Sequence, residues 1–466
     1  MRLPLFAATV LALGLVAAPL QARDAAPALT IPPSGVMGVG EAQLTPAFWI
    51  GLQKQPDHVI LDRAAIAAEN AKLLQVDPSM HDLRALPKTL TREQVAGWIN
   101  GLSERPKRQM YDVEGKPLPA ATLDALIDNL ALSDIPAQQE TRYGLVVQRA
   151  SFHTFPTNLR AFNVSGDTDI DRFQETAEFP GVPVVIVHAS RDGKWLFVVS
   201  PRYAAWTEKE NVAEGTAAQV FGYADKTPYR VVTGASVRTV FTREVPGASQ
   251  LQLDMSTRVP LLNLPPDQPV NGQTPYAAYT LQLPLRGADG KLQFTPALLQ
   301  KNTDTAGDYL PLTPANIIRQ AFKFLGERYG WGHAYDGRDC SGFVSDVYRS
   351  MGVQMPRNTS KQAISPALEH RAFTDKDSRE ARIKAARELQ VGDLVYIPGH
   401  VMMVLGQRDG QPYVIHDVGG MTYRQADGSM RHIKLNAVSV TPLLPMQSND
   451  HQTYVDRMTS IVRIRR

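Results

Sequence analysis

The chain has 466 residues, a formal net charge of +3, and 43% hydrophobic and 20% charged residues. This composition is that of a globular protein, and the length indicates more than one domain. It lacks the strong basic excess of a nucleic-acid-binding protein, so no nucleic-acid partner is expected.

The N-terminus has the pattern of a secretory signal. Arg2 supplies a positive charge, residues 3–20 carry none and are mostly apolar, and Ala22 is a small residue before a cut ahead of Arg23. A membrane anchor is the alternative, but proline and glycine interrupt the stretch. No later segment is apolar over the length that spans a bilayer. We expect residues 1–22 to be a signal peptide, and the mature protein to be exported to the periplasm or cell envelope without a transmembrane segment.

Residues 23–141 form the first predicted region, and its pattern is helical. Thr91 and Gln94 make a capping box, and apolar residues repeat at helical spacing near Leu123 and Leu126. No group of residues in this region suggests catalysis.

From residue 142 the pattern changes to short β-strands. Asp192-Gly193 and Asp289-Gly290 each lie between apolar runs, which is a strong hairpin signal. The spacing predicts two small β-barrel-like modules, 142–212 and 213–295. One continuous β-domain is the competing interpretation, and residues 296–313 have the composition of a linker.

The last domain, residues 313–466, is predicted to be α+β. Thr313 followed by Pro314 starts a helix, a second helix follows Cys340, and strands are expected at 393–406 and 411–418. Helices therefore come first and the sheet later, which is the order of an α+β domain.

Cys340 is the single cysteine, so no internal disulfide can form. A lone thiol is often only a small buried hydrophobe, and its surroundings must decide. Asp339 is a natural N-cap, which places Cys340 in the first turn of a helix. There the helix dipole favours a thiolate, and backbone N–H groups are available to a developing oxyanion. This position indicates a nucleophile.

Two histidines follow on the predicted strands. His400 and His416 lie on adjacent antiparallel strands, although the register of the long hairpin between them is not fixed by the sequence. Either one alone would most simply be a hydrogen-bonded polar residue. Together with Cys340 they supply a nucleophile, a base and a residue that orients the base.

These segments resemble a known family. Tyr329-Gly-Trp-Gly, Asp339-Cys-Ser-Gly-Phe, Pro356-Arg357, Gly392-Asp393 and Gly399-His400-Val401 are similar to the NlpC-type bacterial cell-wall cysteine peptidases, which are papain-like. The resemblance covers residues 313–466. The upstream regions resemble the multidomain members, which carry an N-terminal stabilising domain and two bacterial SH3-like domains.

The resemblance implies hydrolysis of the bond between γ-D-glutamate and a diamino acid in peptidoglycan stem peptides. Cys340 would be the nucleophile, His400 the general base and acid, and His416 the residue orienting His400. Asp339 and Ser341 match positions that help to hold the free amine of an N-terminal L-alanine, and Tyr329 matches a tyrosine lining the site. No cofactor or metal is implied, and the oligomeric state is not indicated.

Simpler interpretations accompany these assignments. Asp339 is also a helix cap, Tyr329 and Trp331 could be core aromatics, and His333 has no expected role. A non-catalytic wall-binding protein that uses its SH3-like modules is the main alternative function. Another transfer reaction on the same fold is a second alternative, although lipid-acting relatives place histidine before cysteine and here the cysteine comes first.

Overall fold

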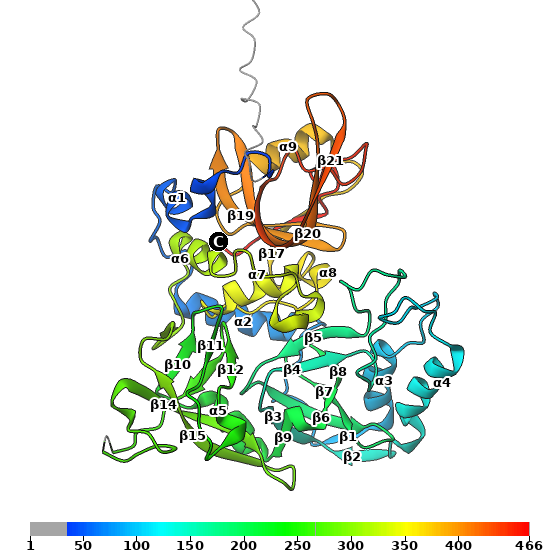
Figure 1. Ribbon diagram of the computed structural model, residues 1–466, viewed down its shortest axis with the longest axis vertical. Coiled ribbons are helices and arrows are strands. Elements are labelled where there is room, and N and C mark those ends of the chain that lie inside the picture. The colour runs from blue at the N-terminus through cyan, green and yellow to red at the C-terminus, as the bar shows by residue number, and fades with distance from the viewer. Residues whose placement is uncertain (1–34, 266, 466) are drawn as a thin grey trace, which may run out of the picture.

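The computed structural model describes residues 35–265 and 267–465, so the expected signal peptide lies outside the described residues. The predicted α+β class is confirmed. The C-terminal domain lies at one end of the molecule, and two β-modules lie next to each other at the other end (Figure 1). In the described part of the chain no helix is long and apolar enough to cross a membrane.

The C-terminal domain is built on a six-stranded sheet in which each strand is antiparallel to its neighbours, in the order β17-β22-β18-β19-β20-β21. The predicted strand at 393–406 is two strands, because the chain reverses at Pro398-Gly399. The elements of the domain are α6 (Pro314–Phe322), η6 (Trp331–Asp336), α7 (Cys340–Arg349), α8 (Thr359–Gln362), β17 (Glu369–Ala372), α9 (Arg379–Arg387), β18 (Leu394–Ile397), β19 (His400–Arg408), β20 (Gln411–Arg424), β21 (Met430–Pro442) and β22 (Ser460–Arg463).

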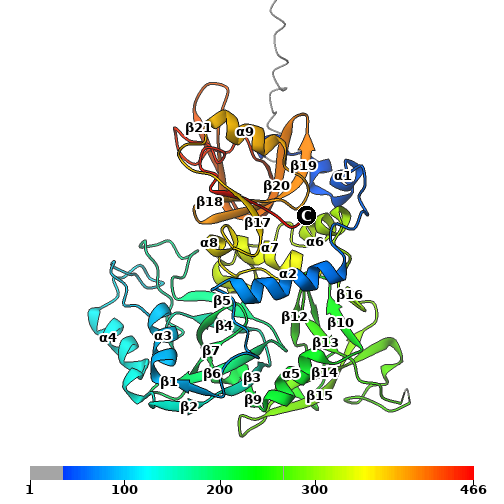
Figure 2. The ribbon, with the colours of Figure 1, turned by 180° about the vertical axis from the view of Figure 1, so that it is seen from behind.

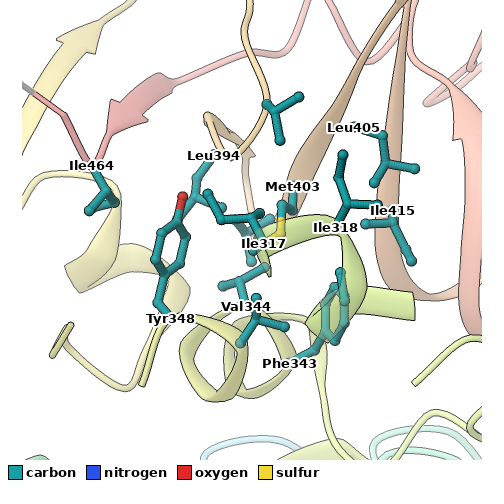
Figure 3. Close-up of a cluster of buried hydrophobic side chains, with 14 of the residues drawn as sticks. Ile317, Ile318, Phe343, Val344, Tyr348, Leu394, Met403, Leu405, Ile415 and Ile464 are labelled. Atoms are coloured by element: carbon teal, nitrogen blue, oxygen red, sulfur yellow. The ribbon is translucent and has the colours of Figure 1, made fainter. Parts of the chain in front are cut away.

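Helices α6 and α7 pack on one face of this sheet (Figure 3). The predicted cap of α6 is confirmed, because the Thr313 hydroxyl accepts from the Asn316 N–H at 3.1 Å. Ile318 of α6 and Phe343 of α7 are fully buried against sheet residues such as Leu405. Burial of each such side chain stabilises the folded state by about 1.5–3 kcal/mol, so this core fixes the start of α7 relative to the sheet.

The first β-module is one seven-stranded sheet in the order β5-β4-β8-β7-β6-β3-β9. The hairpin expected at Asp192-Gly193 is present between β6 and β7, with Gly193 at φ +66°. The elements are β3 (Arg142–Val146), β4 (Ala150–His153), β5 (Gln174–Glu178), β6 (Pro183–Ala189), β7 (Trp195–Val199), β8 (Ala204–Glu208), η3 (Lys209–Asn211) and β9 (Val212–Gly215).

The second β-module consists of three small sheets, β13-β10-β16, β11-β12 and β14-β15. It continues past residue 295 into the expected linker, since β15 runs to Gln300 and β16 pairs with β10. Pro296 lies within β15, which pairs only with β14 among the described strands, and a strand paired along one edge tolerates proline. The elements are α5 (Ala217–Asp225), β10 (Tyr229–Val232), β11 (Ser236–Arg238), η4 (Pro246–Ala248), β12 (Gln252–Asp254), β13 (Arg258–Pro260), η5 (Pro275–Ala277), β14 (Ala278–Arg286), β15 (Leu292–Gln300) and β16 (Thr305–Ala306).

The N-terminal region, residues 35–141 of the described chain, contains helices that pack on two different domains. Trp49 and Ile66 are buried in the core of the C-terminal domain, whereas Val95 and Leu123 are buried against the first β-module. Short helices cannot bury their own apolar faces, so each packs on the nearest domain. The elements are η1 (Glu41–Leu44), α1 (Pro46–Gly51), α2 (Arg63–Val76), β1 (Thr89–Thr91), α3 (Arg92–Leu102), α4 (Ala120–Asn129), η2 (Leu132–Asp134) and β2 (Gln138–Glu140).

Helix α2 crosses between the C-terminal domain and the β-modules (Figure 2). Its Asn70 side chain donates to the Gly352 carbonyl at 2.8 Å and accepts from the Gln354 N–H at 2.9 Å. Shortly after the helix, the His81 N–H donates to Pro201 of the first module at 2.9 Å. The segment therefore ties together parts that are distant in the sequence.

A buried carboxylate joins all three domains. Asp254 of the second module accepts from Arg149 of the first module at 2.5 Å and from Arg338 of the C-terminal domain at 2.9 Å. The side chains of Asp254, Arg338 and Arg149 are 0%, 1% and 11% exposed. Arg149 also donates to the carbonyls of His333 and Gly337 in the loop before Cys340. The loop is thus held by both β-modules.

We expect Asp254→Ala to cost about 3–5 kcal/mol of unfolding free energy, because it leaves two buried guanidinium groups without their shared partner. Asp225→Ala is the matched control: Asp225 binds Arg84 at 2.8 Å, but its side chain is 64% exposed, so the loss should stay within about 1 kcal/mol. Urea unfolding of both variants measures the difference. Equal losses would show that Asp254 is not the link between the domains.

Candidate active site

Cys340 is the first residue of α7, and its helix start has the predicted cap. The Asp339 carboxylate accepts from the Gly342 N–H at 2.8 Å. The preceding loop contains three non-glycine residues with positive φ, namely His333, Tyr335 and Asp336. Such backbone persists only when its surroundings fix it, and this loop is fixed by the contacts of Arg149 and of strand β5.

Gly332 is the point of closest approach between this loop and the first β-module. A Cβ at Gly332, where φ is +58°, would lie 2.9–3.0 Å from Gln174 and Glu175 of β5. The Gln174 side chain donates to the Gly332 carbonyl at 2.8 Å, and the Trp331 indole donates to the Gln174 carbonyl at 3.0 Å. Trp331 therefore serves the contact between the loop and the module.

Asp339 and Ser341 belong to a buried polar cluster. Arg357 donates to both oxygens of Asp339, at 3.1 and 2.7 Å, and to the Ser341 hydroxyl at 2.9 Å. Arg357 also donates to the Thr176 hydroxyl of β5 at 2.6 Å and lies 2.9 Å from the ring nitrogen Nδ1 of His333, so His333 has a structural role that the sequence did not indicate. Asp339 also accepts from the Gly332 N–H at 3.0 Å. Both of its oxygens are engaged inside the protein.

These contacts describe Asp339 and Ser341 in the free protein, and the amine-binding roles expected for them stay a prediction. The Arg357 guanidinium holds the pKa of Asp339 down at about 2 even though burial opposes this. The carboxylate is thus ionised but already paired, and only 7% of Asp339 is exposed. An ammonium group that reached Asp339 would compete with the buried Arg357 for its oxygens. In the free protein the two residues position the loop and the start of α7.

The two predicted histidines are brought together. His400 is the first residue of β19, His416 lies on β20, and His400 Nε2 is 2.7 Å from His416 Nδ1. On its other side, His416 Nε2 is 2.9 Å from the hydroxyl of Thr441 on β21. His416 is fully buried, whereas His400 is half-buried. A base at the surface of the site is therefore backed by a buried partner.

The thiol lies beside the start of β19. The Cys340 thiol interacts with the backbone N–H of Val401, the residue after His400, and its sulfur is 3.8 Å from the Thr359 hydroxyl. Within the described residues, no hydrogen bond links the thiol directly to His400. In enzymes without substrate such contacts are often long and tighten when substrate binds.

Residues 326–440 match the NlpC/P60 family, and residues 160–208 match the SH3 domain of the SH3b1 type. This C-terminal domain is an NlpC/P60 domain. The family expected from the sequence is confirmed, and it is a family of cysteine peptidases.

Two known proteins show how far the similarity extends. The gamma-D-glutamyl-L-lysine dipeptidyl-peptidase of Bacillus cereus is 28% identical over 314 residues, which is 58% of this chain and 82% of that protein. An NlpC/P60 endopeptidase from Photobacterium damselae subsp. piscicida shares the fold with a TM-score of 0.69 and 16% identity. That likeness covers 88% of this chain and 94% of the other, so it includes the β-modules as well as the NlpC/P60 domain.

Two further side chains of the NlpC/P60 domain lie close enough to Cys340 to interact with it electrostatically. Tyr329 feels the charges of Cys340 and Asp339, and burial followed by these charges raises its pKa well above the usual value, so its hydroxyl stays protonated and can donate. Asp417 follows His416 and is fully buried, and its two oxygens have no hydrogen-bond partner among the described residues. Burial raises the pKa of Asp417 to about 9, so it is uncharged at neutral pH. No pattern in the sequence pointed to Asp417.

The first β-module contributes a carboxylate that the sequence analysis missed. Glu175 of β5 is half-buried and accepts from the Tyr203 hydroxyl at 2.5 Å and from the Thr154 hydroxyl at 2.6 Å. Tyr203 also contacts Asn358, which precedes Thr359, the neighbour of Cys340. Only the tertiary fold brings this strand to the site, so no local pattern could have identified Glu175.

Burial decides the charge state of the candidate catalytic pair. It raises the pKa of the Cys340 thiol to about 12, with the Asp339 charge adding to the effect, and lowers the pKa of His400 to about 4. Burial therefore opposes the thiolate that the helix start favours. Helix termini contribute about 0.3–1 kcal/mol, whereas burial shifts a pKa by up to about 3–5 units. Both groups are neutral at pH 7.

This predicts slow alkylation of Cys340 at neutral pH. Raising the pKa moves thiolate formation to higher pH, so the rate with iodoacetamide should still be rising at pH 10. The same chain unfolded in urea is the control, and its single thiol should titrate near 8.5. A rate that reaches its plateau below pH 8 in the folded protein would contradict the prediction and indicate a preformed thiolate–imidazolium pair.

Proposed function

We propose that this protein is a cysteine peptidase that hydrolyses the bond between γ-D-glutamate and a diamino acid in peptidoglycan stem peptides. The observation that carries the proposal is the position of Cys340 at the start of α7, beside the strand that begins with the paired His400, within an NlpC/P60 domain. The name of the Bacillus cereus relative supports the choice of bond. Such a substrate places the protein in the cell envelope, in agreement with the secretory pattern of residues 1–22.

The reaction begins with a proton transfer. His400 is neutral because burial lowers its pKa, so it can accept the Cys340 proton when the substrate draws the two groups together. The thiolate attacks the γ-carbonyl carbon of D-glutamate, and a tetrahedral oxyanion forms. Backbone N–H groups at the start of α7 and the Tyr329 hydroxyl are the donors available to this oxyanion.

The second half releases both products. His400 returns its proton to the departing amine of the diamino acid, and the C–N bond breaks to leave a thioester on Cys340. A water molecule then gives a proton to His400 and attacks the thioester carbonyl, which frees the γ-glutamyl product and restores the thiol. His416 orients His400 through the 2.7 Å contact throughout.

The alternative of a non-catalytic wall-binding protein finds less support. Such a protein has no need for a thiol at a helix start beside a buried pair of histidines. Buried polar groups are costly to desolvate, so the burial of His416 against Thr441 is explained more simply by a role in orienting a base.

Cys340→Ala and His400→Ala should each lower kcat/KM on L-Ala-γ-D-Glu-diamino acid by at least about 10³-fold. His416→Ala should keep more activity, because an orienting residue usually matters less than the base. Mass spectrometry of the products measures cleavage. His432→Ala is the matched control, since His432 is an exposed histidine on β21 and its loss should leave the rate unchanged. Near-normal turnover by Cys340→Ala would refute the mechanism.

The specificity that we infer is for stem peptides with a free N-terminal L-alanine. Glu175 is a second candidate for the role expected of Asp339: it is the carboxylate that the first β-module contributes beside Tyr203 and Asn358. A carboxylate in this position can form a charge-assisted hydrogen bond with the α-ammonium of the substrate. The same module closes that end of the site and disfavours peptides still joined to glycan.

Acetylating the substrate amine should therefore cost at least about tenfold in kcat/KM, because it removes the charge and adds bulk. Glu175→Gln should weaken this discrimination, whereas Glu140→Gln on the exposed strand β2 should not. The comparison uses the free tripeptide, its N-acetyl form and intact wall. Equal rates on all three substrates would show that this end of the site is open.

A further inference from the structure

Thr441 and Met446 extend the pair of histidines into a longer chain of hydrogen bonds. His400 Nε2 lies 2.7 Å from His416 Nδ1, and His416 Nε2 lies 2.9 Å from Thr441 Oγ1. The Thr441 hydroxyl in turn donates to Met446 Sδ at 3.3 Å. Apart from His400, every member is fully buried.

The direction of this chain follows from its last member. A thioether sulfur carries no hydrogen and can only accept, so Thr441 must be the donor to Met446. Thr441 has a single hydroxyl hydrogen, and its oxygen therefore accepts from His416 Nε2–H. A neutral His416 that is protonated on Nε2 has a bare Nδ1, which accepts from His400 Nε2–H. The remaining nitrogen of His400, Nδ1, is then unprotonated.

We propose that Thr441, oriented by Met446, is a positioning residue that holds His416 and His400 in the tautomers in which His400 Nδ1 is free to accept the Cys340 proton. This inference rests on the proposed function for its catalytic meaning, but the tautomers can be measured without any substrate. It assigns a role to a residue on β21 that touches neither the thiol nor the substrate.

The opposite direction would disable the base. If Thr441 donated to His416 Nε2, then His416 Nδ1–H would donate to His400 Nε2. The proton of a neutral His400 would then sit on Nδ1, where it blocks transfer from Cys340. A ring protonated on both nitrogens would not distinguish the two directions, but burial lowers the pKa of both histidines and keeps both rings neutral. The acceptor that the Thr441 hydroxyl takes thus decides which ring nitrogen of His400 carries the proton, two hydrogen bonds away.

The segment between β21 and β22 supplies the acceptor and covers the chain. Met446 is fully buried, and the ring of Tyr454 lies edge-on to His400 with centroids 6.5 Å apart. The Tyr454 N–H donates to the Met446 carbonyl at 2.8 Å, which links the two covering residues. Water is therefore kept from the far side of the histidines, where it could offer Thr441 a different partner.

The test compares Thr441→Val, which keeps the shape and removes the hydroxyl, with Thr441→Ser, which keeps the hydroxyl. Thr422→Val is the matched control, because the Thr422 hydroxyl lies 2.9 Å from His432 Nδ1 in an exposed Thr–His pair on the same strands. The first readout is ¹⁵N NMR of the histidines in the full mature chain. We expect wild-type His400 and His416 to be protonated on Nε2 alone, and Thr441→Val to show mixed tautomers at both.

The second readout is turnover of L-Ala-γ-D-Glu-diamino acid. Thr441→Val should lower kcat about 10–100-fold with KM changed less than twofold, Thr441→Ser should stay within about threefold of wild type, and Thr422→Val should equal wild type. Met446→Leu should act in the same direction as Thr441→Val. A wild-type His400 protonated on Nδ1, or unchanged tautomers in Thr441→Val, would overturn the inference. Expected tautomers in a protein that does not cleave the peptide would instead support the inference and refute the proposed function.

Discussion

The buried carboxylate of Asp254 is the interaction on which the arrangement of the molecule depends. It lies between arginines from two other domains, Arg149 and Arg338, and the same arginines reach the loop that leads to Cys340. Arg338 also binds Asp346 on α7 at 3.0 Å and Glu327 at 3.1–3.2 Å. A guanidinium with several acidic partners is stable inside a protein only while all of them are present. The second β-module is thus part of the support of the catalytic helix, although it contributes no residue to the candidate site.

The first β-module is closer to the chemistry. Its strand β5 contacts the loop before Cys340 at Gly332, and the same strand carries Glu175, which accepts from Tyr203. Helix α2 completes the arrangement through Asn70, which binds the backbone just after α7. The three contacts reach α7 from different sides. The nucleophile is therefore positioned by the whole chain and not by its own domain alone.

The local parts of the structure could be predicted from the sequence. The caps at Thr313 and Asp339, the capping box at Thr91 and the turn at Asp192-Gly193 follow from short-range chemistry that the residues themselves carry. The sequence predicted that His400 and His416 lie on neighbouring strands. It did not predict the register of these strands, because the hairpin between the histidines is long and its turn does not determine which residues pair.

The remaining features depend on contacts between distant segments. Nothing near Asp339 in the sequence shows that Arg357 folds back onto it. Glu175 and Asp254 come from strands that no local pattern connects with Cys340. The helix start that favours a thiolate is visible in the sequence, whereas the burial that raises the pKa of the Cys340 thiol is not. The packing of the N-terminal helices on two different domains also depends on contacts between distant segments, so the sequence did not predict it.

The close approach at Gly332 has a consequence for how such proteins can change over evolutionary time. Because a side chain at this position would collide with the backbone of β5, the loop and the strand can diverge only together. A gene fragment that encodes residues 313–466 would leave behind the surface against which its own loop is shaped. Exchange of the catalytic domain between unrelated proteins should therefore be rare, and successful exchanges should carry the first β-module along as a single inherited unit.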